Sequence, residues 1–178
     1  MKKSFLIMVV LLSLATLAFA GAGQNQNRSD GLDADQKATI YSVYEEEKVA
    51  RDVYKTLGDL YPEENTFANI QLSEQTHMDA VRNLCVNYGI EIPVSDAVGA
   101  FTSDAMRDLY QSFVDDGKTA LTSALHVGID IETMDIEDLG SALYGMPYDV
   151  QQVFINLLNG SSHHLDAFTI AIEREPQP

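Results

Sequence analysis

A run of apolar residues in helical spacing, broken by two ionisable residues, constrains this chain more than any other feature. Between Phe67 and Tyr88 the apolar side chains recur in steps of three and four, which places them on one face of a helix. The two positions that interrupt this face are Glu74 and His77. Burying a charge or an imidazole without a partner is costly, so a helix with this face needs a partner for both side chains. A bound metal ion is one such partner.

Three further stretches have apolar faces of the same kind, at residues 35–57, 118–143 and 148–174. The polar positions that interrupt them are Glu47, Glu132, Asp135, Ser161 and His164. Each interruption lies near the middle of its predicted helix, and mid-helix positions meet at one level in an antiparallel bundle. We therefore expect one buried site that contains Glu47, Glu74, His77, Glu132, Asp135 and His164.

The neighbours of these residues are expected to point elsewhere. Glu45 and Glu46 fall off the apolar face that contains Glu47. His163 falls on a polar face of its predicted helix, and His126 is expected to face outward. None of these four neighbours is assigned to the site.

The residue types at the expected site indicate a transition metal. Imidazole and carboxylate ligands suit iron, manganese or zinc. Glu-x-x-His pairs on facing helices are how carboxylate-bridged di-iron and di-manganese bundles bind their metals. The alternative is a metal-free polar network, which can stay buried if every member is hydrogen-bonded.

Several segments of the chain resemble proteins of the ferritin-like superfamily. The segment EKVARDVY at 47–54 resembles the first ligand helix of rubrerythrin-type members. The segments FANIQLSEQTH, IETMDIEDL and NLLNGSSHHLDAF together resemble an uncharacterised ferritin-like family, domain of unknown function 2202. This resemblance covers nearly all of the chain after its leader. It implies an all-α fold, a ferritin-like up-down four-helix bundle with one long crossover that contains a short extra helix.

The resemblance also implies a ligand set. Dinuclear ferritin-like proteins take a Glu from the first helix, Glu-x-x-His from the second, a Glu from the third and Glu-x-x-His from the fourth. The residues that match this pattern are Glu47, Glu74, His77, Glu132 and His164. Ser161 stands where the fourth helix should offer its Glu. Asp135, one turn beyond Glu132, is the candidate replacement, and without it the site holds one metal, an asymmetric pair or no metal.

The function that the resemblance implies is oxidative metal chemistry. Iron is the expected metal, in a di-iron or mononuclear site, with manganese or zinc as alternatives. Ferroxidase, peroxidase or oxidase-like activity would make the protein an oxidoreductase, whereas the residues alone indicate only metal binding. The alternative is a non-enzymatic helical bundle that binds or stores metal, or an interaction module of the cell envelope.

The first twenty residues have the pattern of a Sec-type signal peptide. Lys2 and Lys3 form a positive start, residues 5–17 are almost all apolar, and AFA at 18–20 has the spacing of a cleavage site. The expected organisation is a signal peptide at 1–20, a flexible linker at 21–33 and a bundle domain at 34–175. The protein is then secreted, periplasmic or held in the cell envelope, and retention of the leader as an anchor is the alternative.

The net charge of the chain limits the classes of partner that it can bind. The formal charge is −16, and loss of Lys2 and Lys3 with the leader makes it −16 − 2, or −18. Such a charge repels nucleic acid and anionic membrane surfaces. No stretch after the leader is long and apolar enough to span a bilayer. Metal ions are therefore the expected partners, with no nucleic acid and no stable membrane insertion, and the sequence leaves a homodimer open.

The links between the predicted helices fit a bundle. Residues 58–65 and 145–147 are short, and short links make antiparallel neighbours. Residues 89–117 form one long connection, with a short helix predicted at 103–116. Cys85 is the only cysteine, so no intramolecular disulfide forms, and a buried thiol is expected.

Overall fold

The expected all-α bundle is confirmed. A computed structural model describes residues 31–175, and within that range it contains helices but no strand. The five helices are α1 (Ala34–Leu60), α2 (Asn65–Tyr88), α3 (Asp104–Gly117), α4 (Leu121–Ala142) and α5 (Tyr148–Arg174). The predicted signal peptide and most of the predicted linker lie outside the described residues. None of the five helices is long and apolar enough to cross a membrane.

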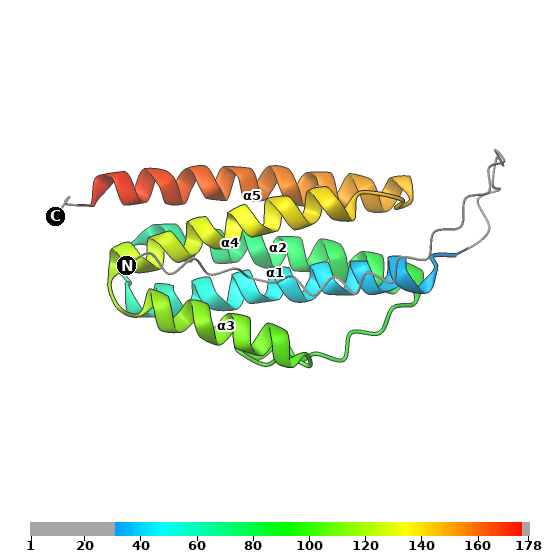
Figure 1. Cartoon of the computed structure of the whole chain (residues 1–178), viewed down its shortest axis with the longest axis horizontal. Helices are drawn as coiled ribbons and strands as arrows, with labels where there is room; N and C mark the ends of the chain where they lie inside the picture. Colours follow the sequence, from blue (N-terminus) through cyan, green and yellow to red (C-terminus); the bar gives the residue numbers. More distant parts are fainter. Residues whose placement is uncertain (1–30, 176–178) are drawn as a thin grey trace, which may run out of the picture. The chain divides into compact units, whose positions relative to one another are not determined.

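Helices α1, α2, α4 and α5 form the bundle, and α3 lies in the crossover. α1 packs against α2, α4 packs against α5, and the two pairs meet where α2 contacts α5 and α1 contacts α4. α3 lies on the outside of the bundle, against α1 and α4 (Figure 1). The long connection that contains α3 lets α2 and α4 run in the same direction, as one long crossover requires.

Local sequence signals account for most helix ends, and two links differ from expectation. Asp33 and Gln36 form a reciprocal capping box at the start of α1. Gly89 ends α2 with a φ of 61°, a conformation that glycine adopts without strain. The first link is only residues 61–64, because α1 continues through Gly58 to Leu60. α4 begins at Leu121, later than the expected 118, because the backbone N–H of Lys118 still bonds to α3 at Val114.

The apolar core has two parts, one on each side of a polar layer. Along α1, the residues before Glu47 belong to one part and those after it to the other. α5 shows the same division around Ser161 and His164. The first part includes Ile40, Val43, Met78, Leu139, Phe154 and Leu157, and the second includes Tyr54, Leu57, Phe67, Leu125 and Phe168. The ionisable residues therefore occupy the middle of the bundle, between two dry cores that fix the helices around them.

α1 is buried on more sides than its apolar face predicts. It contacts α2, α3 and α4, so its outer face lies under the crossover. Lys48 and Asp52 have no exposed surface and form an ion pair with Nζ to Oδ2 at 2.5 Å. Glu45, which lies off the apolar face, is nevertheless buried and accepts a hydrogen bond from Thr102. The single-helix pattern missed the burial of Lys48 and Glu45 because their distant partners, Ala97 and Thr102, lie some fifty residues away in the chain.

Candidate metal centre

The four bundle helices bring five ionisable side chains to one level. α1 supplies one, α2 two, and α4 and α5 one each, namely Glu47, Glu74, His77, Glu132 and His164. The three glutamates are 1 % exposed and the two histidines 8 % exposed. His163, one residue from His164, is exposed, so the register of α5 is the one that the apolar spacing predicts. His126 is also exposed.

One group of ligand atoms joins α1 to α2. Nδ1 of His77 lies 2.9 Å from Oε2 of Glu74 and 3.1 Å from Oε2 of Glu47. Each of these three residues offers one ligand atom, and the three atoms lie within 4.8 Å of one another. They form one candidate cation position.

A second group joins α2 to α4 and α5. Nδ1 of His164 lies 2.7 Å from Oε1 of Glu74 and 3.6 Å from Oε2 of Glu132. The ligand atoms of these three residues also lie within 4.8 Å of one another. They form a second candidate position, which shares Glu74 with the first. The two oxygens of Glu74 thus face different histidines, and the imidazole rings stack with centroids 5.4 Å apart.

The spacing of these atoms fits a cation between them. At metal–ligand distances of about 2.0–2.2 Å, ligand atoms at right angles lie about 3 Å apart. Oε1 of Glu47, Oε1 of Glu74 and Nδ1 of His164 are buried and accept or donate no hydrogen bond within residues 31–175. Oε1 of Glu74 and Nδ1 of His164 are close without being hydrogen-bonded to each other. Buried polar atoms without a hydrogen bond are rare, and bonds to a metal would satisfy all three.

Burial and mutual contact shift the pKa values of the carboxylates in opposite directions. Burial raises the pKa of Glu74, but His164 and His77 outweigh it and lower the pKa to about 2. Burial raises the pKa of Glu132 to about 7, and burial together with Asp135 and Glu74 raises the pKa of Glu47 well above 4.5. Glu74 is therefore the ionised carboxylate at the centre of the group.

The neighbouring carboxylates favour the protonated form of His164 when no metal is bound. Burial lowers its pKa, but the carboxylates of Glu132 and Glu74 outweigh burial and raise the pKa to about 10. A metal ligand must be deprotonated, so a metal at Nδ1 displaces this proton. Within residues 31–175, no lysine or arginine forms an ion pair with Glu47, Glu74 or Glu132. A divalent cation would therefore replace the imidazolium proton as the positive charge beside these buried carboxylates.

Comparison with known proteins places the chain in a family. The model of the uncharacterized protein domain DUF2202 matches residues 35–177. The chain belongs to the DUF2202 family. The uncharacterized protein MJ0754 of Methanocaldococcus jannaschii is 40 % identical over 139 residues, which are 77 % of this chain and 75 % of that protein. The crystal structure of hypothetical protein MJ0754 matches with a TM-score of 0.78 at 37 % identity, over 83 % of this chain and 85 % of that one.

Two outer hydrogen bonds support the second position of this DUF2202 centre. The hydroxyl of Tyr54 donates to Oε1 of Glu132 at 2.6 Å, and Nε2 of His164 lies 2.8 Å from Oγ of Ser73. Such partners orient metal ligands and fix the imidazole tautomer. Ser73 was not anticipated from the sequence, because it lies off the apolar face that contains Glu74 and no spacing within α2 shows that it meets His164 of α5.

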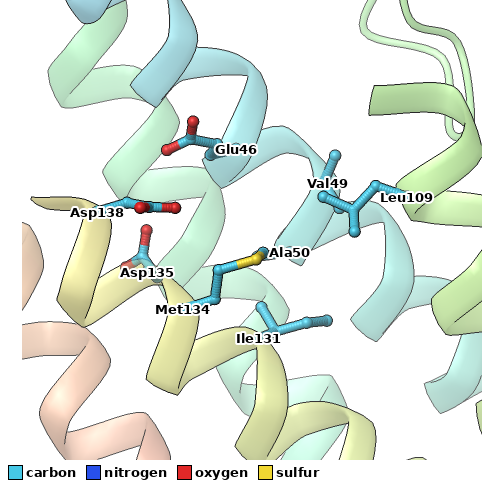
Figure 2. A pocket seen from close by; sticks show the side chains of 8 residues that line it. All are labelled: Glu46, Val49, Ala50, Leu109, Ile131, Met134, Asp135 and Asp138. Carbon is cyan, nitrogen blue, oxygen red and sulfur yellow. The ribbon is translucent and has the colours of Figure 1, made fainter. Parts of the chain in front are cut away.

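Asp135 lies beside the two groups and belongs to neither. Its Oδ2 accepts a hydrogen bond from Ser161 at 2.5 Å, which links α4 to α5 at the position where the ferritin-like pattern has a Glu. Burial raises the pKa of Asp135 well above 3.8. In Figure 2 its carboxylate points toward that of Asp138, in a pocket between α1, α3 and α4 that Glu46 also lines. The other residues of the pocket are Val49, Ala50, Leu109, Ile131 and Met134.

Proposed function

We propose that this DUF2202 protein binds two transition-metal ions, with iron favoured, in a carboxylate-bridged centre inside the bundle. The observation that carries the proposal is the sharing of Glu74 by two ligand groups, one oxygen facing each histidine. Glu47 and His77 would hold one ion and Glu132 and His164 the other. Iron, manganese and zinc all accept this donor set, so the preference for iron rests on the resemblance to ferritin-like proteins and not on the geometry of the site.

We also propose that the bound metal gives the protein oxidoreductase activity. Iron in such a centre supplies electrons to oxygen or peroxide, which is ferroxidase- or peroxidase-like chemistry. The chain's own contribution is a site that excludes bulk water, since the carboxylates are 1 % exposed, and ligands oriented by Tyr54 and Ser73. The leader at residues 1–20 supports the further proposal that this chemistry takes place outside the cytoplasm.

A non-enzymatic metal-binding protein is the second candidate. It is favoured by Ser161, because a hydroxyl in place of a fourth-helix carboxylate leaves the second position with less negative charge. Oxidation of Fe(II) in air separates the two functions. An enzyme speeds the appearance of Fe(III) above the rate in buffer for many equivalents of iron, whereas a storage or structural site stops after its own positions are filled.

Metal should stabilise the folded protein. A ligand that binds only the folded state at 100 times its Kd adds about 2.7 kcal/mol. For a domain of this size we expect Fe(II), Mn(II) or Zn(II) to raise the melting temperature by about 10 °C. Differential scanning calorimetry of metal-free protein under anaerobic conditions measures the shift.

Two variants make the metal response specific to the proposed site. His77→Ala should lose the part of the shift that the Glu47–His77 position supplies, whereas His163→Ala, which removes an exposed imidazole, should keep the whole shift. A parent protein that no metal stabilises, or a His77→Ala variant that responds like the parent, contradicts the proposal.

The contribution of Asp135 can be separated from that of general negative charge. If Asp135 supplies the carboxylate that Ser161 lacks, Asp135→Asn should weaken the second binding step by about 10- to 100-fold, and adding Ser161→Glu should restore part of it. Asp138→Asn makes the same charge change in the same pocket and serves as the control. Titration calorimetry with Mn(II) measures both steps. Equal effects of the two aspartate variants would show that Asp135 contributes only general negative charge and does not replace the missing carboxylate.

A further inference from the structure

Gly160 lies at an unusual place for a glycine, in the middle of α5 and against the ring of His77. α5 runs from Tyr148 to Arg174, and the backbone at Gly160 does not have the positive φ that calls for glycine. Glycine in a helix interior destabilises the helix relative to alanine. A Cβ atom at this position would lie 2.5 Å from Nε2 and 2.7 Å from Cε1 of His77. The missing side chain therefore makes room for the imidazole.

The two histidines of the centre are oriented by different means. Nε2 of His164 lies within hydrogen-bond distance of Ser73, at 2.8 Å. His77 has its Nδ1 against Glu74 and Glu47, but the far edge of its ring packs on the α5 backbone at Gly160. Contact with the α5 backbone therefore orients the ring of His77, whereas a hydrogen bond orients the ring of His164.

We infer that Gly160 is a positioning residue, which sets the His77 ring so that Nδ1 faces Glu47 and Glu74. The inference rests on the proposed metal site and names a residue of α5 that contributes no ligand atom. It also assigns to Gly160 its main effect at the Glu47–His77 position, because the atoms nearest to a Cβ at residue 160 belong to His77 and none of them to His164.

The size of the clash decides the expected effect. Ordinary contacts between carbon atoms lie near 3.5–4.0 Å, so a Cβ at position 160 would displace the ring by about 1 Å. Binding sites tolerate errors of about 0.5 Å in their ligand groups. We therefore expect Gly160→Ala to weaken metal binding at the Glu47–His77 position by about 10- to 100-fold, the range found when the support of a metal ligand is lost.

A matched control separates this contact from the general effect of adding a methyl group to a helix. Gly140 is also helical, in α4, and a Cβ there would meet no atom within 4 Å. Gly140→Ala should bind metal like the parent. Ser73→Ala, which removes the partner of His164, should weaken the other binding step and so assign each step to its position.

The experiment is titration calorimetry of Zn(II) into the metal-free full-length protein and these three variants. Two binding steps in the parent, with one selectively weakened in Gly160→Ala and neither changed in Gly140→Ala, support the inference. Parent-like binding in Gly160→Ala overturns it while leaving the proposed function intact. Absence of any binding in the parent overturns the proposed function and this inference together.

Thermal unfolding of the metal-free proteins tests the contact even if Gly160→Ala is poorly folded. In a His77→Ala background the clash is gone, so adding Gly160→Ala should raise the melting temperature, as alanine does in a helix. In the parent background the same substitution should raise it less or lower it. Equal shifts in the two backgrounds would show that the two residues are not coupled and would overturn the inference.

Discussion

Replacing Glu74 by glutamine should remove both metal-binding steps at once. Each oxygen of Glu74 faces a different histidine, at 2.9 Å for His77 and 2.7 Å for His164, so its charge serves both positions. An amide has a similar shape but lacks the negative charge and one acceptor. We expect both affinities to fall by more than about 100-fold, beyond the loss caused by removing an outer partner. Titration calorimetry with Mn(II) or Zn(II) measures the two steps.

The effect of Glu74→Gln on the metal-free protein needs its own measurement. The folded pKa of Glu74 is about 2, below its ordinary value of 4.5. A lowered pKa means that the carboxylate contributes stability above pH 4.5 and that this contribution is lost as the pH falls toward 2. Glu74→Gln should therefore unfold more easily than the parent at neutral pH, and this difference should shrink in acid. Urea unfolding of both proteins at neutral pH and in acid measures this difference in stability, which is then separated from the effect on metal binding.

Comparison with single-position variants makes the Glu74 result decisive. His77→Ala and His164→Ala should each leave one step near its parental affinity, whereas Glu74→Gln should leave neither. Glu137→Gln removes one charge from the exposed side of α4 and should leave both steps unchanged. A Glu74→Gln variant that still binds one ion tightly would contradict a shared carboxylate and favour two independent sites.

Asp52→Ala should produce the largest loss of stability, at a place unrelated to the metal. Asp52 accepts from Lys48 at 2.5 Å, from Arg51 at 2.6 Å and from the backbone N–H of Gly99 at 2.9 Å. Lys48 and Asp52 have no exposed surface, so the substitution leaves a buried ammonium without a counter-charge, in contact only with neutral groups such as the carbonyl of Ala97 and the ring of Phe101. Breaking such a buried pair costs about 3–5 kcal/mol. Urea unfolding of the metal-free protein measures it.

Two comparisons test whether the unpaired charge causes this loss. Asp59→Ala removes an exposed carboxylate from the same helix and should change stability by less than about 0.5 kcal/mol. Adding Lys48→Met to Asp52→Ala should recover part of the loss, because no charge is then left buried. If the double variant is as unstable as Asp52→Ala alone, the lost anchoring of the crossover at Gly99 is the main cause instead.

The bundle and most of the candidate site could be predicted from the sequence because both depend on helical spacing. Steps of three and four define a face within one helix without knowledge of its neighbours. The same spacing distinguished His164 from His163, and the structure buries the first and exposes the second. Mid-helix interruptions in four stretches also located the level at which the side chains meet.

Contacts between elements were beyond the reach of that pattern. Helical spacing alone gives no reason to bury Lys48, Arg51 and Asp52, but the crossover covers them with Asp96, Ala97 and Gly99. Asp135 shares a face with Glu132, yet its side chain bonds to Ser161 and stays outside both ligand groups. Such facts depend on the approach of α3, α4 and α5, which no single helix encodes.

The sequence by itself determined which residues turn inward, because side-chain direction along a helix follows from 3.6 residues per turn. Only the tertiary structure decided which of those residues meet, and in what order. In the tertiary structure one oxygen of Glu74 faces His77 and the other faces His164. Tyr54 donates a hydrogen bond to Glu132, and Ser73 lies within hydrogen-bond distance of His164. The backbone of Gly160 packs against the ring of His77. These pairings arise from the packing of separate helices, where distances of a few tenths of an ångström decide whether a site can form.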